Sequence, residues 1–93
     1  MSFRRIEYFL SVAKHLNFTK AARECYVAQA AISQQIKQFE EELGFKLFNR
    51  GGASVSLTPA GEYFAKQCQA VLAQYNGAVK QARFLAEGKK RDL

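Results

Sequence analysis

A polar stretch of the sequence, positions 29 to 38, holds the side chains best suited to binding chemistry. If the stretch is helical, its outward face presents four neutral hydrogen-bonding groups and one cation, namely Gln29, Ser33, Gln34, Lys37 and Gln38. Such groups can meet base edges and phosphates in a DNA major groove without acidic repulsion, and a glutamine can pair with adenine through two hydrogen bonds. The residues alone also leave open a solvated polar face that has no partner.

The acidic residues that follow are placed where they would not disturb such a contact. Glu40, Glu41 and Glu42 stand together at the C-terminal end of the stretch, which is the unfavourable end of a helix for negative charge. The placement is reasonable if the N-terminal half approaches a polyanion, because Gln29 and the positive end of the helix dipole then face it. We therefore expect the three glutamates to point away into solvent.

Residues that could carry catalysis or hold a metal lack suitable partners. His15 is the only histidine, and Ser33 has no histidine near it in the sequence. Cys25 and Cys68 lie far apart without a neighbouring cysteine or histidine, which is neither a disulfide framework nor a zinc signature. No glycine-rich loop opens a helix, as a nucleotide-phosphate motif would require. We expect no enzyme activity, no catalytic residue, no metal and no cofactor.

The composition is that of one small, basic, globular domain. Fourteen Lys and Arg residues against eight Asp and Glu give a net charge of +6, and 48% of the residues are hydrophobic. Such a charge attracts polyanions, chiefly nucleic acid or an anionic membrane surface. No apolar run is long enough to span a membrane, and the N-terminus has no apolar run that would make it a secretory signal. With two unpaired thiols, the chain is expected to be cytoplasmic.

Three elements that position the polar stretch are predicted to be helices. Apolar residues recur every three or four positions over residues 3–16, and cap-type residues at 17–19 start a second, shorter helix through Cys25. A break at 26–28 leads into a third helix that ends before Gly44. The buried stripe of this third helix is Ile32, Ile36, Phe39 and Leu43. Two helices joined by such a short break, over about residues 18–37, indicate a helix-turn-helix.

Beyond Gly44 the pattern predicts a β-hairpin and then one long helix. Residues 46–48 and 55–57 are strand-like and flank a flexible turn at 51–54. Thr58 and Pro59 form a strong helix start, and no breaker other than a tolerated glycine follows before Gly88. This helix carries a heptad seam that favours pairing with a second copy of itself, although the helix could instead fold back on its own domain. The seam positions are Phe64, Cys68, Val71, Tyr75, Ala78, Ala82 and Leu85.

Five motifs, spaced in register along nearly the whole chain, resemble one known family. They are FTKAA at 18–22, AQAAISQQI at 28–36, FEEELG at 39–44, LFNR at 47–50 and LTPAG at 57–61. Together they are similar to the N-terminal region of LysR-type transcriptional regulators. The resemblance implies a mainly α fold, in which a winged helix-turn-helix of three helices plus a two-stranded β-wing spans residues 1–58. A long linker helix for dimerisation follows at 59–87, and residues 88–93 form a tail.

The resemblance also implies which residues touch DNA. It places the third helix in the major groove, where the expected base contacts are Gln29, Ala30, Ser33 and Gln34. The hairpin at 46–57 is the wing, and its tip at 50–54 is implied to reach the minor groove. The expected phosphate or wing contacts are Thr19, Lys20, Arg23, Lys37, Lys46, Arg50, Gly51, Gly52 and Ala53, although four of the lysine and arginine side chains (20, 23, 37 and 46) could equally be ordinary surface cations.

Several positions depart from the usual family pattern. The family commonly has serine at the position of Ala28, proline at Ala30 and arginine at Gln34. Alanine at 28 removes a helix cap, at a cost of about 1 kcal/mol. Glutamine at 34 removes the two-point contact that arginine makes with guanine, so the base preference at that step should differ. The wing lacks the arginine often found at its tip, which leaves Arg50 and the glycine amides as its phosphate contacts.

The function implied by the resemblance is sequence-specific binding of double-stranded DNA and regulation of transcription, as a homodimer on a two-fold symmetric site. Regulators of this kind also have an effector-binding domain after the linker helix and can form tetramers through it. The 93 residues contain no such domain, so we expect them to be the DNA-binding region of a longer regulator, without the effector response. The alternatives are a dimeric protein-interaction module and a nonspecific nucleic-acid binder.

Overall fold

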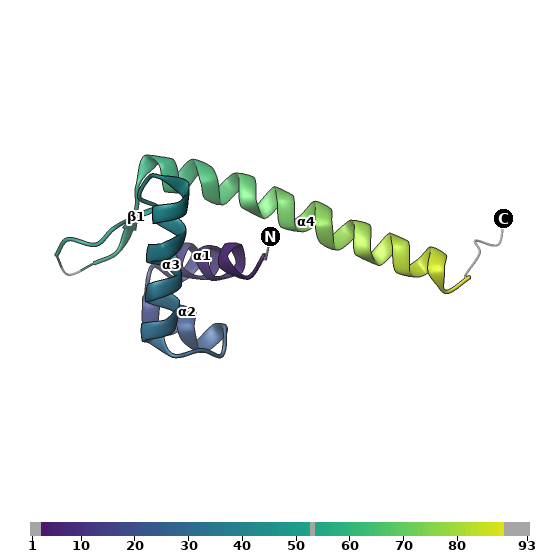
Figure 1. The fold of residues 1–93 in the computed structure, drawn as a ribbon, viewed down its shortest axis with the longest axis horizontal. Helices are drawn as coiled ribbons and strands as arrows, with labels where there is room; N and C mark the ends of the chain where they lie inside the picture. The colour runs from purple at the N-terminus through teal and green to yellow at the C-terminus, as the bar shows by residue number, and fades with distance from the viewer. Residues whose placement is uncertain (1–2, 53, 89–93) are drawn as a thin grey trace.

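The computed structural model describes residues 3–52 and 54–88 as four helices and one hairpin (Figure 1). The elements in chain order are α1 (Arg4–His15), α2 (Phe18–Glu24), α3 (Gln29–Leu43), β1 (Phe48–Asn49), β2 (Ser56–Leu57) and α4 (Pro59–Ala86). Helices α1 to α3 form a compact body. The hairpin projects from one end of this body, and α4 extends far beyond the other, which gives the molecule dimensions of 59 × 26 × 21 Å.

The breaks between the first three helices follow from local capping. Asn17 caps α2, because its side-chain oxygen accepts a hydrogen bond from the backbone N–H of Lys20 at 2.8 Å. Tyr26 adopts a left-handed conformation with φ of 59° in the turn between α2 and α3. Gly44 ends α3 with φ of 87°, a conformation that glycine adopts without steric cost. The three predicted helices and their breaks are confirmed.

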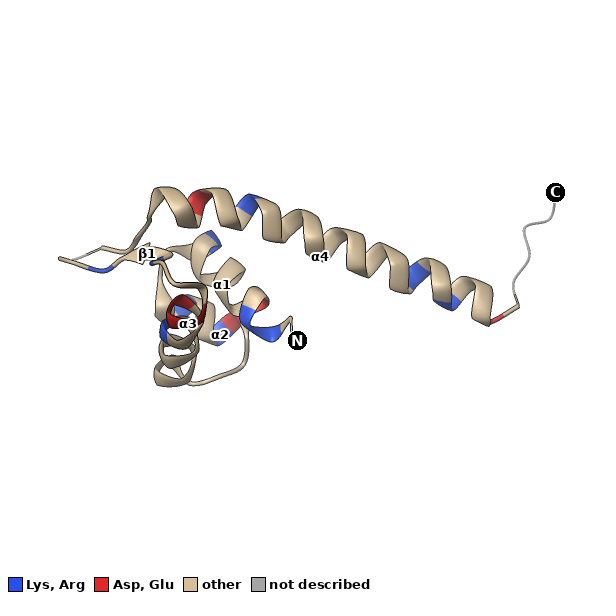
Figure 2. Cartoon of the chain, turned by 45° about the horizontal axis from the view of Figure 1, so that its top comes forward, with Lys and Arg blue, Asp and Glu red and all other residues tan. Residues whose placement is uncertain are grey.

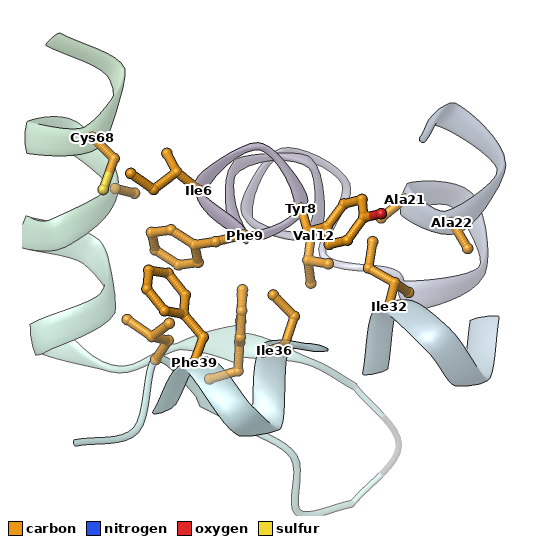
Figure 3. Close-up of a cluster of buried hydrophobic side chains, with 13 residues drawn as sticks. Ile6, Tyr8, Phe9, Val12, Ala21, Ala22, Ile32, Ile36, Phe39 and Cys68 are labelled. Carbon is orange, nitrogen blue, oxygen red and sulfur yellow. The ribbon is translucent and has the colours of Figure 1, made fainter. Parts of the chain in front are cut away.

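The core fixes the inner side of α3 against α1 (Figure 3). Phe9 is fully buried, and its ring centroid lies 6.3 Å from that of Phe39 and 5.6 Å from that of Phe48. Ile32 and Ile36 of α3 are also fully buried. The predicted stripe of α3 therefore faces the core, while Leu43 at its end is only half-buried. With this side committed to packing, the opposite side of α3 is presented to solvent.

The hairpin is antiparallel and short. Phe48 pairs with Leu57 and Asn49 with Ser56, so Phe48 points into the core while Asn49 is exposed. The predicted hairpin is confirmed, although β1 begins two residues later than expected; Leu47, in the link before it, is buried. A two-stranded hairpin of this size is marginal by itself, so its position depends on the groups that hold its base.

Helix α4 begins as predicted and packs its first part onto the body. The Thr58 hydroxyl accepts a hydrogen bond from the Gly61 N–H at 2.9 Å, and Pro59 occupies the first turn. Cys68 is buried, and burial raises the pKa of its thiol. The ring of Tyr75 still reaches Phe3, at 4.8 Å between centroids. Beyond Tyr75, α4 extends away from the body (Figure 1), so the fold-back alternative holds only for the part of α4 up to this residue.

None of the helices in the described part of the chain combines the length and the apolar character that crossing a membrane would require.

Candidate nucleic-acid interface

The outward side of α3 carries the residues expected to read bases. Gln29, Ala30 and Gln34 are exposed, and Ser33 is half-buried. With 3.6 residues per turn these four positions share one side of the helix with Lys37, and this side borders the buried stripe. The side is polar, uncharged apart from one lysine, and open to a partner.

The first turn of α2 lies directly beside the N-terminus of α3. The Thr19 hydroxyl donates a hydrogen bond to the side-chain oxygen of Gln29 at 3.2 Å. Ala28, the N-cap residue of α3, makes no side-chain hydrogen bond to the helix. The first amides of α3 are therefore not occupied by a capping side chain and can receive an anionic group. Thr19 and Gln29, which are both predicted to contact DNA, are therefore joined to each other by a hydrogen bond.

Arg50, at the base of the hairpin, adjoins the first residue of α2. Its guanidinium carbon lies 5.1 Å from the centroid of the Phe18 ring, and its Nη2 is 3.4 Å from a carboxylate oxygen of Glu40. The hairpin base, the start of α2 and the start of α3 therefore form one continuous surface. Figure 2 shows that basic positions occur on the projecting hairpin and that the acidic positions of α3 gather on one segment of that helix.

The remaining predicted phosphate contacts within residues 3–52 and 54–88 are exposed, and no hydrogen bond or ion pair in this part of the chain joins their side chains to the base-reading side. Lys20 and Arg23 lie on α2 and, with His15 and Glu24, line one shallow hollow. Lys46 is exposed just before β1. Gly51 and Gly52 are exposed at the hairpin tip, whereas Ala53 lies outside the described residues.

Gln38 does not belong to the outward face, contrary to the expectation from the sequence. Its side-chain oxygen accepts a hydrogen bond from Arg5 of α1 at 3.1 Å. The same guanidinium donates to Gln35 at 3.1 Å and pairs with Glu42 at 2.8 Å. Arg5 thus holds a row of three polar residues on a side of α3 that faces α1. The sequence spacing of positions 35, 38 and 42 could have indicated that Gln38 lies on this side, because residues three and four apart share one side of a helix.

Glu40 also differs from the expectation, because it is buried and does not point into solvent. Only 3% of the residue is exposed. Its Oε2 accepts hydrogen bonds from the backbone N–H groups of Leu47 at 2.7 Å and Phe48 at 3.2 Å. Glu41 and Glu42 are exposed as expected. The sequence did contain a signal, because position 40 follows Ile36 by one turn and so continues the buried stripe.

A polar cluster around Glu24 joins the end of α1 to α2. The Ser11 hydroxyl donates a hydrogen bond to Glu24 at 2.5 Å, and Lys14 and His15 contact the same carboxylate at 2.9 and 3.1 Å. The Ser11 and Lys14 hydrogen bonds lower the pKa of Glu24 from 4.5 to about 2. His15 is thus a partner in a surface cluster. Over the described residues, no group of three or more His, Cys, Asp or Glu side chains could hold a metal ion.

The predicted seam of α4 divides into a packed and an exposed part. Phe64 and Cys68 face the core of their own chain: the Phe64 ring lies 5.7 Å from that of Phe9, and Cys68 is buried. From Val71 onward the seam residues are exposed, and Val71 and Leu85 have exposed fractions of 47% and 64%. The exposed seam residues are Val71, Tyr75, Ala78, Ala82 and Leu85.

Comparisons with known proteins give one consistent result. The family model described as "Bacterial regulatory helix-turn-helix protein, lysR family" matches residues 3–62. The chain is 42% identical over 90 residues to the HTH-type transcriptional regulator AlsR of Bacillus subtilis. It is 41% identical over 93 residues to the HTH-type transcriptional regulator BudR of Klebsiella aerogenes. The alignments cover 97% and 100% of this chain but only 30% and 65% of those two regulators.

Solved structures with the same fold include DNA complexes. The crystal structure of the BenM DBD with catB site 1 DNA superposes with a TM-score of 0.93 at 34% identity and covers all of both chains. The CbnR DBD in its DNA complex superposes with a TM-score of 0.86 at 31% identity, over 92% of this chain and 99% of that one.

Proposed function

The chain belongs to the lysR family of bacterial regulatory helix-turn-helix proteins, and from that premise we propose that it binds specific double-stranded DNA sites and regulates transcription. The observation that carries the proposal is the outward side of α3, whose exposed groups are amides, a methyl, a hydroxyl and one lysine. The acidic residues of α3 are buried or lie at its far end. Two structural relatives, the BenM and CbnR DBDs, are known as DNA complexes.

In the proposed complex the N-terminal half of α3 enters the major groove. Gln29 and Gln34 can each hydrogen-bond two atoms of an adenine, Ser33 can donate or accept, and the Ala30 methyl can contact a thymine methyl. Thr19 and Lys37 flank this set and bind phosphates. Arg50, Gly51 and Gly52 add wing contacts, and Lys20, Arg23 and Lys46 add further cationic contacts to the backbone.

The proposed active species is a homodimer formed through α4. Val71, Tyr75 and Leu85 leave a row of apolar side chains at least partly exposed along α4, although the Tyr75 ring also contacts Phe3, and pairing with a second copy would bury this row. Two copies related by a two-fold axis would present two α3 helices to two half-sites. The protein would act in the cytoplasm and carry out no chemical reaction itself.

The chain spans about a third and about two thirds of the length of the two curated relatives named above. Responses to an effector and assembly into tetramers are therefore proposed for a longer protein and not for these residues. What we propose for these residues is DNA recognition and dimer formation.

A salt titration on two kinds of duplex tests the proposal. One duplex is selected from a random pool by the chain itself, and the other has a scrambled sequence. If the dimer neutralises about six to ten phosphates, log K should fall with log salt at a slope of about −5 to −9. Affinity for the selected duplex should exceed that for the scrambled one by about a thousandfold. A protein-interaction module would show neither effect, and a nonspecific binder would show the slope without the discrimination.

Two substitutions on α3 separate base reading from phosphate binding. Gln29→Ala should relax the preference at one base pair of each half-site, at a cost of about 1–3 kcal/mol on the selected duplex. Lys37→Ala should weaken binding to both duplexes alike and make the salt slope shallower by about one unit per subunit. Equal losses on both duplexes for Gln29→Ala would show that the base-reading assignment is wrong.

A further inference from the structure

The carboxylate of Glu40 is buried, and the donors that satisfy it among the described residues all come from the base of the hairpin. The side chain is 2% exposed, and an unpaired carboxylate at such a depth would be strongly destabilising. Its three donors come from one short segment at the base of the hairpin. They are the backbone N–H of Leu47 at 2.7 Å, the backbone N–H of Phe48 at 3.2 Å and Nη2 of Arg50 at 3.4 Å.

These hydrogen bonds are the ones that join α3 to the hairpin among the described residues. Glu40 lies on α3, which also carries Gln29 and Gln34 on its outward side. The hairpin strands are only two residues long, so they cannot hold the tip in place alone. Whatever fixes the hairpin base to α3 therefore sets the position of the wing tip relative to the base-reading residues.

Arg50 extends the same link to α2. Its guanidinium lies between the Glu40 carboxylate and the Phe18 ring, and its side chain is 33% exposed. A guanidinium has five N–H donors in a fixed plane. Only one of its nitrogens lies near Glu40, so part of the group remains open to solvent on the surface shared with α2. Glu40 thus adds a second, directional contact to a guanidinium that the Phe18 ring also contacts.

We propose that Glu40 is a positioning residue for DNA binding, which fixes the wing and the Arg50 guanidinium in register with the base-reading side of α3. This inference rests on the proposed function, because it concerns how the same surface engages a duplex. The inference gives a negatively charged residue a role in favour of DNA binding, although its charge alone would repel the DNA. Near a polyanion, the loss of a negative charge should by itself strengthen binding.

The test compares Glu40→Gln with Glu41→Gln in the full chain. Glutamine at 40 keeps an oxygen for the Leu47 and Phe48 amides but turns an NH2 group toward Arg50, where it cannot accept a hydrogen bond. Glu41→Gln changes the charge equally at the adjacent, exposed position. The probe is the duplex that the wild-type chain selects from a random pool, read by affinity and by hydroxyl-radical footprint.

We expect Glu40→Gln to bind this duplex about tenfold more weakly, the equivalent of one charge-assisted hydrogen bond. Protection should be lost only at the nucleotides that the wing covers, with the base preferences set by α3 unchanged. Glu41→Gln should bind as tightly as wild type or slightly more tightly. The two variants remove the same charge, so a general electrostatic effect would change their affinities in the same direction and cannot explain opposite responses.

Three outcomes would overturn the inference. They are equal binding by the two variants, protection lost over the whole site, and relaxed base preference at the α3 positions. If Glu40→Gln fails to fold, Glu40→Asp keeps the charge but is too short to reach all three donors, and it should lose the same wing protection. Unfolding of both would show that Glu40 serves the fold and not the wing. Failure of the wild-type chain to prefer any duplex would instead refute the proposed function.

Discussion

Replacing Gly61 with alanine should destabilise the junction between the wing and α4. A Cβ atom at position 61 would stand 2.1 Å from the backbone oxygen of Leu47, far inside an ordinary van der Waals contact. The same oxygen accepts a hydrogen bond from the backbone N–H of Thr58 at 3.0 Å, and the Thr58 hydroxyl donates to the neighbouring Lys46 carbonyl at 2.8 Å. Relief of the clash must therefore move α4 away from the segment that leads into β1 and lengthen both bonds.

The size of the effect can be worked out from these contacts. Overpacking of this kind costs about 1–3 kcal/mol, and each of the two hydrogen bonds that Thr58 donates to this segment contributes about 0.5–1.5 kcal/mol. Alanine is favoured over glycine within a helix by about 1 kcal/mol, which offsets part of the loss. The net expectation is that Gly61→Ala lowers the free energy of unfolding by about 3 kcal/mol.

Gly77→Ala is the matched control on the same helix. A Cβ at position 77 meets no atom within 4 Å, so only helix propensity changes and the variant should be more stable by about 1 kcal/mol. Urea unfolding followed by circular dichroism, at one fixed protein concentration because a dimer is expected, measures both values. If Gly61→Ala were as stable as Gly77→Ala, the close approach of α4 to Leu47 would be wrong.

Three further predictions concern other parts of the chain. Tyr26 is 95% exposed and has a positive φ of 59°, so Tyr26→Gly should relieve the strain and raise the free energy of unfolding by up to about 1 kcal/mol; a lower melting temperature would contradict this. The lowered pKa of Glu24, about 2 against 4.5, means a contribution to stability that is present above pH 4.5 and is lost as the pH falls toward 2. Ser11→Ala should raise that pKa in a carboxyl NMR titration and make the acid loss of stability shallower, and an unchanged titration would exclude Ser11 as its main cause. Val71→Glu puts a charge on the exposed seam of α4 and should give monomers in sedimentation, whereas an intact dimer would refute pairing through this face.

Much of the fold could be predicted from local sequence signals. Asn17 and Gly44 mark helix ends because the chemistry of a cap is set by one residue and its nearest amides. The pair at 58–59 fixes the start of α4 in the same way. The apolar stripe of α3 correctly predicted which side of the helix is buried, because the period of a helix depends on the backbone alone.

The errors arose where a side chain depends on a distant segment. Glu40 looked like a member of an exposed acidic run, and its burial becomes favourable because the distant Leu47 and Phe48 amides donate hydrogen bonds to its carboxylate. Gln38 looked outward because its contact, Arg5, lies on another helix. Cys68 fits the heptad pattern of a dimer seam as well as it fits a core. A sequence pattern records that a position is apolar or polar, but it does not record which surface covers it.

The most direct test of base reading by α3 is a change of base preference. Gln34 stands where related regulators commonly have arginine, and arginine pairs with guanine where glutamine pairs with adenine. Duplexes should be selected from a random pool with the wild-type chain and with Gln34→Arg, and the two motifs compared. We predict that both motifs are two-fold symmetric and differ at one base pair of each half-site, which changes from adenine to guanine. Identical motifs, or a change spread over the whole site, would contradict the placement of this side of α3 against the bases.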